Sequence, residues 1–118
     1  MITFFIVLFS NACKTSEQTM QNESYFCQGN NPFWKAEINK DEIIFEITGQ
    51  TKEKYPSVKP VESGDLKIYA TFITENNEKT WLKIKIKDGP CQTSSAGKTF
   101  PFKVEIERND ITYYGCAE

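Results

Sequence analysis

Four cysteines are the most reactive side chains of this chain, and they lie at Cys13, Cys27, Cys91 and Cys116. The sequence contains no histidine, so a cysteine nucleophile would lack the imidazole base that usually activates it. No two cysteines form a C-x-x-C pair, and histidine is the other common zinc ligand. We therefore expect no metal and no cofactor, and the cysteines are candidates for lipid or disulfide chemistry.

Two further sets of residues are weak candidates for catalysis. Ser94, Ser95 and Lys98 lie close together in a segment of small polar residues, which is typical of a loop. Glu105 and Glu107 alternate with apolar residues, so we expect them on the solvent side of a strand and not as a catalytic acid pair. We predict that the protein is not an enzyme.

The start of the chain resembles the export signal of a bacterial lipoprotein. Residues 1–9 are mostly apolar, and Ala12 precedes Cys13. This run is too short to span a bilayer, which takes about 20 residues, but it fits the core of a signal peptide. In a lipobox the cysteine receives diacylglycerol and the signal is cut before it. We therefore predict a signal peptide over 1–12, a lipid anchor on Cys13 and a flexible polar tether over 13–24.

Two alternatives stay open for this segment: export without a lipid, and a buried first strand in which Cys13 is incidental. No Lys or Arg precedes the apolar run, although export signals usually begin with basic residues. Lipidation places the protein in the bacterial cell envelope. Lys14 follows the anchor in place of the aspartate associated with inner-membrane retention, which favours the outer membrane.

Composition limits the domain organisation and the partners. The chain has 118 residues, which is the length of one domain. Its net charge is −2, from 14 basic and 16 acidic residues, and nucleic-acid binding needs a concentrated basic face. We expect no nucleic-acid partner. No pattern in the sequence specifies an oligomeric state.

Residues 25–118 carry a β pattern. Runs of strand-forming residues flank short polar turns in pairs, which predicts three sequential hairpins. The runs are 33–38, 43–47, 66–74, 80–87, 100–108 and 111–115. The Asn109-Asp110 loop suits a type I′ turn. We interpret 49–64 as a loose connector and expect one or two further short strands within 50–65. We predict an all-β domain, a small antiparallel meander of about 6–8 strands that closes into a barrel or a strongly curved sheet.

The run 80–87 alternates clearly between apolar residues and lysines. Trp81 falls on the lysine side with Lys83 and Lys85, and Tyr69 comes from the facing strand. Together with Trp34, these four residues form a candidate binding surface. The alternative is that the lysines are only the solvated side of a sheet.

The cysteines should pair if the chain enters an oxidising compartment. With a lipid on Cys13, three of the four cysteines remain, so one is left over. We favour a Cys91–Cys116 disulfide with Cys27 unpaired and at least partly buried. A Cys27–Cys116 disulfide is the main alternative.

Two segments resemble the signatures of a family of uncharacterised bacterial envelope lipoproteins. Residues 25–34, Y-F-C-Q-G-N-N-P-F-W, are similar to its F-x-C-x-G-N-x-P-F-W motif. In its second signature a cysteine opens a polar loop, an aromatic-Pro pair follows, and a hairpin closes on Gly-Cys-Ala. Here the matching residues are Cys91, Gly97, Phe100-Pro101 and 115–117. By general architecture the family is similar to META-domain (HslJ-like) proteins and membrane-bound inhibitors of c-type lysozyme, which implies little about function.

These observations favour a non-catalytic binding or structural module of the cell envelope. Its expected partners are the membrane, through the lipid anchor, and an envelope protein or glycan, through the surface of the domain. A lysozyme-inhibitor-like protein and a small barrel that holds an apolar ligand are the alternatives. A cleft with strongly perturbed titratable groups would instead indicate an enzyme.

Overall fold

The computed structural model describes residues 24–93 and 97–118, and in this part of the chain the fold is all-β. The strands are β1 (Tyr25–Asn30), β2 (Phe33–Ile38), β3 (Glu42–Ile47), β4 (Lys52–Pro56), β5 (Val61–Ser63), β6 (Leu66–Glu75), β7 (Glu78–Gln92), β8 (Thr99–Arg108) and β9 (Ile111–Ala117). All of them belong to one antiparallel sheet, as predicted. The signal peptide, Cys13 and nearly all of the tether lie outside the described residues. Within those residues, no helix is long and apolar enough to cross a membrane.

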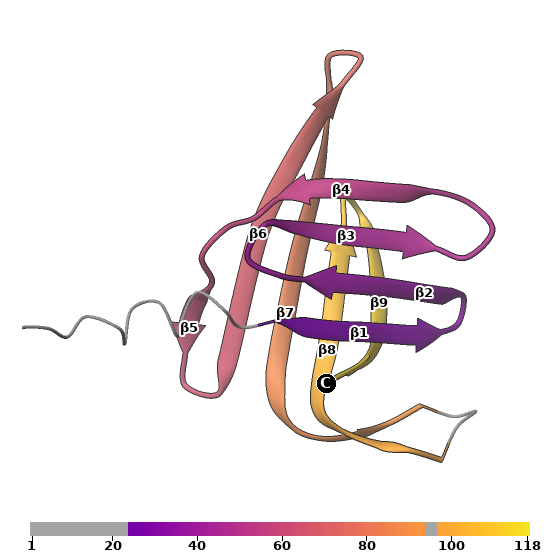
Figure 1. Ribbon diagram of the computed structural model, residues 1–118, viewed down its shortest axis with the longest axis vertical. Coiled ribbons are helices and arrows are strands. Elements are labelled where there is room, and N and C mark those ends of the chain that lie inside the picture. Colours follow the sequence, from indigo (N-terminus) through magenta and orange to yellow (C-terminus); the bar gives the residue numbers. More distant parts are fainter. Residues whose placement is uncertain (1–23, 94–96) are drawn as a thin grey trace, which may run out of the picture.

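The sheet consists of two meanders joined edge to edge. Its strand order is β4-β3-β2-β1-β9-β8-β7-β6-β5, so β1–β4 form one meander and β5–β9 the other. The first and last strands join them, because Phe26 and Glu118 exchange backbone hydrogen bonds of 2.9 Å in both directions. Figure 1 shows the strands of the first meander crossing the steep strands β6 and β7.

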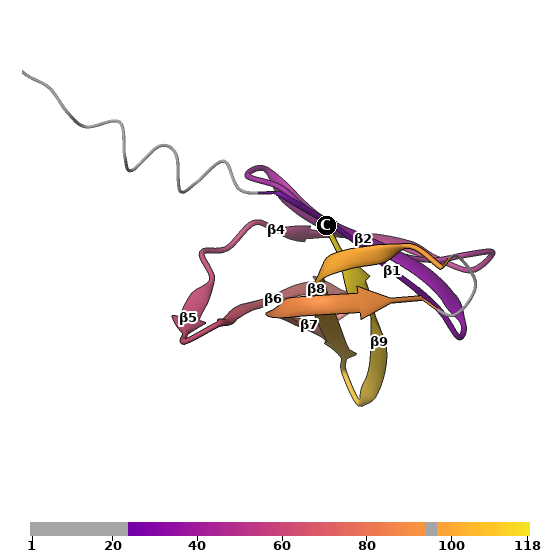
Figure 2. The same ribbon diagram turned by 90° about the horizontal axis from the view of Figure 1, so that it is seen from below.

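The sheet bends so that its two halves face each other, with β2 and β4 on one side and β6 and β7 on the other (Figure 2). The Thr71 hydroxyl donates to the Pro56 carbonyl over 3.0 Å, which fastens the end of β4 to β6. The sheet is not closed into a barrel, so the predicted closure is not confirmed. The physical reason is that β4 crosses β6 at an angle (Figure 1), and crossed strands cannot form a ladder.

The described residues hold nine strands, so the prediction of about 6–8 strands is not confirmed either. Residues 25–30 of the first signature form β1, and the turn that follows falls on Asn31-Pro32. The connector 49–64 holds β4 and β5. The type I′ turn is wrong at Asn109-Asp110, where Asn109 alone has a positive φ. It fits Asn76-Asn77 instead, because both residues have positive φ, 53° and 66°.

The core fills the space between the two halves of the sheet. Leu82, Ile84 and Ile86 are buried, as their alternation predicts. Aromatic rings from both meanders contact one another: Phe45 and Tyr113 have ring centroids 5.3 Å apart, and Trp34 lies 6.0 Å from Phe45. Edge-to-face and tilted ring pairs at such distances add to the free energy gained by burial alone.

The two signature segments meet at one end of the core, where Trp34 packs against backbone. A Cβ on Gly29 would collide with the Trp34 indole nitrogen, and a Cβ on Gly115 would lie 2.8 Å from Cζ2 of the same ring. Cys116, next to Gly115, forms the predicted disulfide with Cys91, with a Cα–Cα distance of 5.6 Å. Cys27 is unpaired and buried, and burial raises the pKa of its thiol to about 12. These residues of the signatures therefore have a packing role.

Candidate binding surface on the β6–β7 hairpin

Some residues of the predicted binding surface are buried in the core, and the others are exposed to solvent. Trp34 and Tyr69 are 1% and 4% exposed, so their assignment to an exposed surface was wrong. Tyr69 faces Ile84 across the ladder, which puts it on the apolar side of β7. At the start of β2, Trp34 points inward and Phe33 outward. Trp81, Lys83 and Lys85 do share one face, as predicted.

A residue that sequence reasoning missed completes this face. Phe72 lies directly opposite Trp81, and their ring centroids are 4.7 Å apart with an interplanar angle of 42°. Phe72 is 39% and Trp81 48% exposed. The sequence of the turn could have revealed Phe72, because a two-residue Asn76-Asn77 loop fixes the register of the hairpin. In that register Glu75 lies opposite Glu78, and three residues further along each strand Phe72 lies opposite Trp81.

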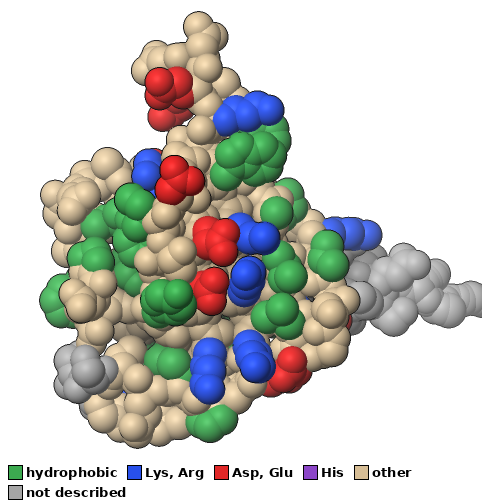
Figure 3. Space-filling model, turned by 180° about the vertical axis from the view of Figure 1, so that it is seen from behind, with side chains coloured by type: hydrophobic (Ala, Val, Ile, Leu, Met, Phe, Trp, Pro, Cys, Tyr) green, Lys and Arg blue, Asp and Glu red, His purple; other side chains and the backbone are tan. Residues whose placement is uncertain are grey.

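Lys79 lies over both rings. Its Nζ is 4.7 Å from the Phe72 centroid and 5.6 Å from the Trp81 centroid, distances at which a cation is attracted to a ring face. We call Phe72, Lys79, Trp81 and Lys83 the aromatic–lysine surface. It lies on the hairpin that projects from the rest of the domain (Figure 1), and Figure 3 shows hydrophobic side chains beside a basic one below the projecting tip.

The charge of this face is uneven along β7. The Lys85 ammonium lies 3.6 Å from Glu105 and 3.7 Å from Glu107, so acidic neighbours offset its charge. Among the described residues, no carboxylate lies within ion-pair distance of Lys79 or Lys83. The aromatic end of the face is therefore positively charged.

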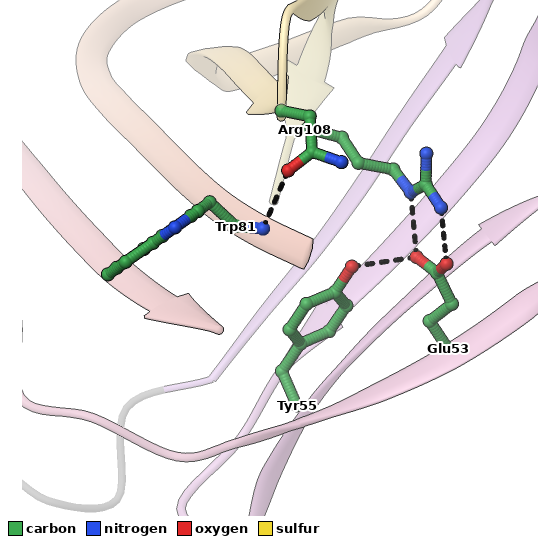
Figure 4. A network of polar contacts seen from close by, with 5 residues as sticks. Glu53, Tyr55, Trp81 and Arg108 are labelled. Atoms are coloured by element: carbon green, nitrogen blue, oxygen red, sulfur yellow. Dashed lines mark hydrogen bonds and ion pairs between the residues drawn. The ribbon is translucent and has the colours of Figure 1, made fainter. Parts of the chain in front are cut away.

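The base of the hairpin is held by a polar network (Figure 4). Arg108 donates to both carboxylate oxygens of Glu53, over 2.9 and 2.6 Å, and Tyr55 donates to Glu53 over 2.7 Å. Beside it, the Asn109 side chain accepts a hydrogen bond of 2.9 Å from the Trp81 amide. The network ties the edge strand β4 to the end of β8 and fixes the backbone from which Trp81 projects.

The titration of this network follows from its contacts. The hydrogen bonds from Arg108 hold the pKa of Glu53 below its usual range. Burial, together with the hydrogen bond to Glu53, raises the pKa of Tyr55. The bond with Glu53 also raises the pKa of Arg108. All three shifts arise from one ion pair and its neighbour, so they have a structural explanation without catalysis.

The other residues considered for catalysis form surface ion pairs where the structure describes them, as Glu105 and Glu107 do with Lys85. Lys98 pairs with Glu118 over 3.3 Å on the surface, while Ser94 and Ser95 lie outside the described residues. In the part of the chain that the structure describes, no three His, Cys, Asp or Glu side chains are placed to hold one metal ion. What this face can do, by its geometry, is make contacts through two rings and two ammonium groups.

Comparisons with family models, with curated proteins and with solved structures found no match. The resemblance of residues 25–34 and of the chain's end to an envelope lipoprotein family therefore stays a prediction.

Proposed function

We propose that the protein is a non-catalytic binding module of the bacterial cell envelope. The signal peptide over 1–12 exports it, and a lipid on Cys13 anchors it, in our proposal, to the outer membrane. The Cys91–Cys116 disulfide supports this location, because disulfides persist in oxidising compartments. The partner is an envelope protein or glycan that the domain contacts while the lipid holds it to the membrane.

One observation carries the proposal: two large, half-exposed aromatic rings contact each other in a tilted arrangement under a lysine. A surface Trp or Phe normally lies alone, and clustered exposed aromatics with a nearby cation are typical of interaction sites. The rings also stand on a fixed base, since Asn109 exchanges hydrogen bonds with both the amide and the carbonyl of Trp81. A rigid aromatic pair loses little side-chain entropy when a partner binds.

Binding at the surface is better supported than binding inside the domain. Contacting rings, among them Tyr25 and Phe102 with centroids 5.4 Å apart, occupy the space between the two halves of the sheet. An apolar ligand there would have to displace them.

Lysozyme inhibition is the second candidate, because the β6–β7 hairpin projects and has the shape to enter a cleft (Figure 1). An assay of lysozyme activity with and without the purified protein tests it.

The test of the main proposal is site-directed photo-crosslinking in cells. The full chain carries a photoreactive amino acid in place of Lys83, which lies two residues from Trp81 on the same face. We expect a discrete adduct, identified by mass spectrometry as protein or glycan, that is lost when Phe72→Ala and Trp81→Ala are combined. Tyr114→Ala is the matched control, because Tyr114 is an exposed aromatic residue on β9, outside the aromatic–lysine surface. Adducts that stay the same when Phe72 and Trp81 are both replaced by alanine would refute the proposal.

A further inference from the structure

We propose that the free edge of β6 binds an extended peptide segment of an envelope partner protein, which adds a strand to the sheet beside Phe72. The inference rests on the proposed function and names the class of partner. The peptide it fits carries apolar and acidic side chains. The backbone of β6 and the side chains of the aromatic–lysine surface support it independently.

The backbone of β6 offers hydrogen-bonding groups that no strand uses. β6 pairs with β7 along its whole length, but β5 pairs only with Leu66–Ile68. Glu75 and Glu78 flank the two-residue loop, a position at which the two backbones form a hydrogen-bonded pair. Hydrogen-bonded pairs alternate along an antiparallel ladder, so on β6 the residues at even positions before Glu75 point their amide and carbonyl groups away from β7. These residues are Ala70, Phe72 and Thr74. Within the described residues, no strand other than β7 pairs with β6 beyond Ile68.

This edge differs from the opposite edge of the sheet. β4 carries Lys52, Lys54 and Pro56, which are residues that protect an edge from pairing with another chain. Residues 70–75 of β6 read A-T-F-I-T-E and contain no lysine, proline or glycine. The molecule thus protects one edge and leaves a short stretch of the other ready for strand addition.

The side chains beside the free edge define what the added strand carries. Ala70 and Phe72 lie on the outer face next to it, so an apolar side chain of the peptide would pack on the Phe72 ring. Across β6 stand Lys79 and Lys83, which have no carboxylate partner among the described residues. An acidic side chain on the same face of the peptide complements them, and a basic one is repelled.

An anionic lipid surface would also suit two aromatic rings and two lysines. It would leave the outward amides and carbonyls of Phe72 and Thr74 without a strand to pair with, however, and only an extended chain satisfies both sets of groups. The geometry therefore favours the peptide.

The experiment titrates the full chain, labelled with ¹⁵N, with a short capped peptide in which Thr separates alternating Val and Glu residues, so that the apolar and acidic side chains share one face of the strand. We expect the amide signals of Ala70, Phe72 and Thr74 to shift. A peptide of the same sequence with N-methyl groups on alternate amides, which cannot form the ladder, should bind about tenfold more weakly or not at all. A peptide in which Lys replaces Glu should also lose binding. Both comparisons leave the protein unchanged, so they do not depend on how a variant folds.

A protein variant tests the same edge from the other side. Thr74→Pro removes an outward amide that β7 does not use, and proline is tolerated on edge strands, so binding should weaken about tenfold. Thr74→Val keeps the amide and should bind as the native chain does. Absence of binding, equal binding of the N-methylated peptide, or binding of anionic vesicles in place of the peptide would each overturn the inference. So would a dimer of the chain that Thr74→Pro abolishes, because the edge would then serve a second copy.

These outcomes separate the inference from the proposed function. A Lys83 adduct that depends on Phe72 and Trp81, together with failure of the peptide to bind, refutes strand addition and leaves the binding module intact. Peptide binding without any adduct in cells refutes the envelope function and leaves the chemistry of the edge in place.

Discussion

The two tryptophans of this protein are used in opposite ways at two ends of the sheet. At the end where β1, β2 and β9 meet, Trp34 is fully enclosed, lies against Gly29 and Gly115, and has the Cys91–Cys116 disulfide nearby. On the projecting hairpin, Trp81 stands in solvent beside Phe72. The first end carries both recognisable signatures and the second carries none. The difference teaches that a conspicuous sequence pattern can specify packing, while the surface suited to binding has no signature of its own.

The largest expected effect contrasts the two tryptophans directly. Trp34→Ala leaves a cavity under two glycines and should lower the free energy of unfolding by about 3–5 kcal/mol. Trp81→Ala, on an exposed hairpin, should change it by less than about 1 kcal/mol. Urea unfolding followed by circular dichroism measures both. Equal losses would mean that Trp81 is also part of the core, and the comparison would fail.

The disulfide should stabilise the folded domain without determining the conformation of the β6–β7 hairpin. Its cysteines are 25 residues apart, and closing a loop of that length in the unfolded chain is worth about 3 kcal/mol in the chain-entropy model. We expect the Cys91→Ala, Cys116→Ala double variant to lose that amount while the near-ultraviolet signal of Trp81 and Phe72 stays. Reduction of the native protein should have the same effect. Unfolding midpoints that do not respond to reductant would contradict the prediction.

Alanine at Gly29 or Gly115 should cost about 2–3 kcal/mol, because the added methyl group meets Trp34 and neighbouring backbone. Neither glycine has a positive φ, so the loss comes from the collision and not from the backbone conformation. Gly64→Ala is the control: it lies at φ 63° in open space, and only the left-handed backbone should matter, at about 1 kcal/mol. The order of the three unfolding energies decides whether Trp34 packs as described.

The smallest effect concerns the base of the hairpin and depends on pH. Glu53→Gln should lower the stability by about 1–2 kcal/mol at neutral pH, since it removes a charged partner of Arg108. The pKa of Glu53 is lowered in the folded protein, so ionised Glu53 stabilises above the pKa of the unfolded chain, and this contribution is lost as the pH falls through the folded-state pKa. The gap between native and variant should therefore narrow in acid. Glu78→Gln, at the exposed hairpin turn, should show no such gap.

Local patterns predicted most of the strands. Alternation and short polar turns placed β2, β3 and β6–β9 to within a few residues, because both signals act between neighbours in the sequence. One or two short strands were expected within the connector but their positions were not predicted, and for β4 the reason is physical. It is an edge strand with Tyr55 as its one buried side chain, so its charged residues made it look like a connector. Whether the sheet closes depends on contacts between distant strands, such as Thr71 with Pro56, which no local pattern contains.

The candidate surface was predicted in part. Trp81, Lys83 and Lys85 were placed together because side chains two apart on a strand share a face. Tyr69 was misplaced because its face depends on the register between β6 and β7, which the Asn76-Asn77 loop sets. The same register would have revealed Phe72. Trp34 was ambiguous, since alternation says only that Phe33 and Trp34 point opposite ways and not which of them is buried.

The pairing of β1 with β9 has a mechanical consequence. Any pull on the chain before Tyr25 acts along β1, which is bonded to β2 on one side and to β9 on the other. The strands would have to slide past one another, so their hydrogen bonds share the tension and must break together, whereas a hairpin pulled open at its end loses its bonds one at a time. The hairpin of β6 and β7 lies outside the path of that tension. A pull applied through the chain before Tyr25 can therefore be resisted by the domain while the face that carries Trp81 keeps its shape.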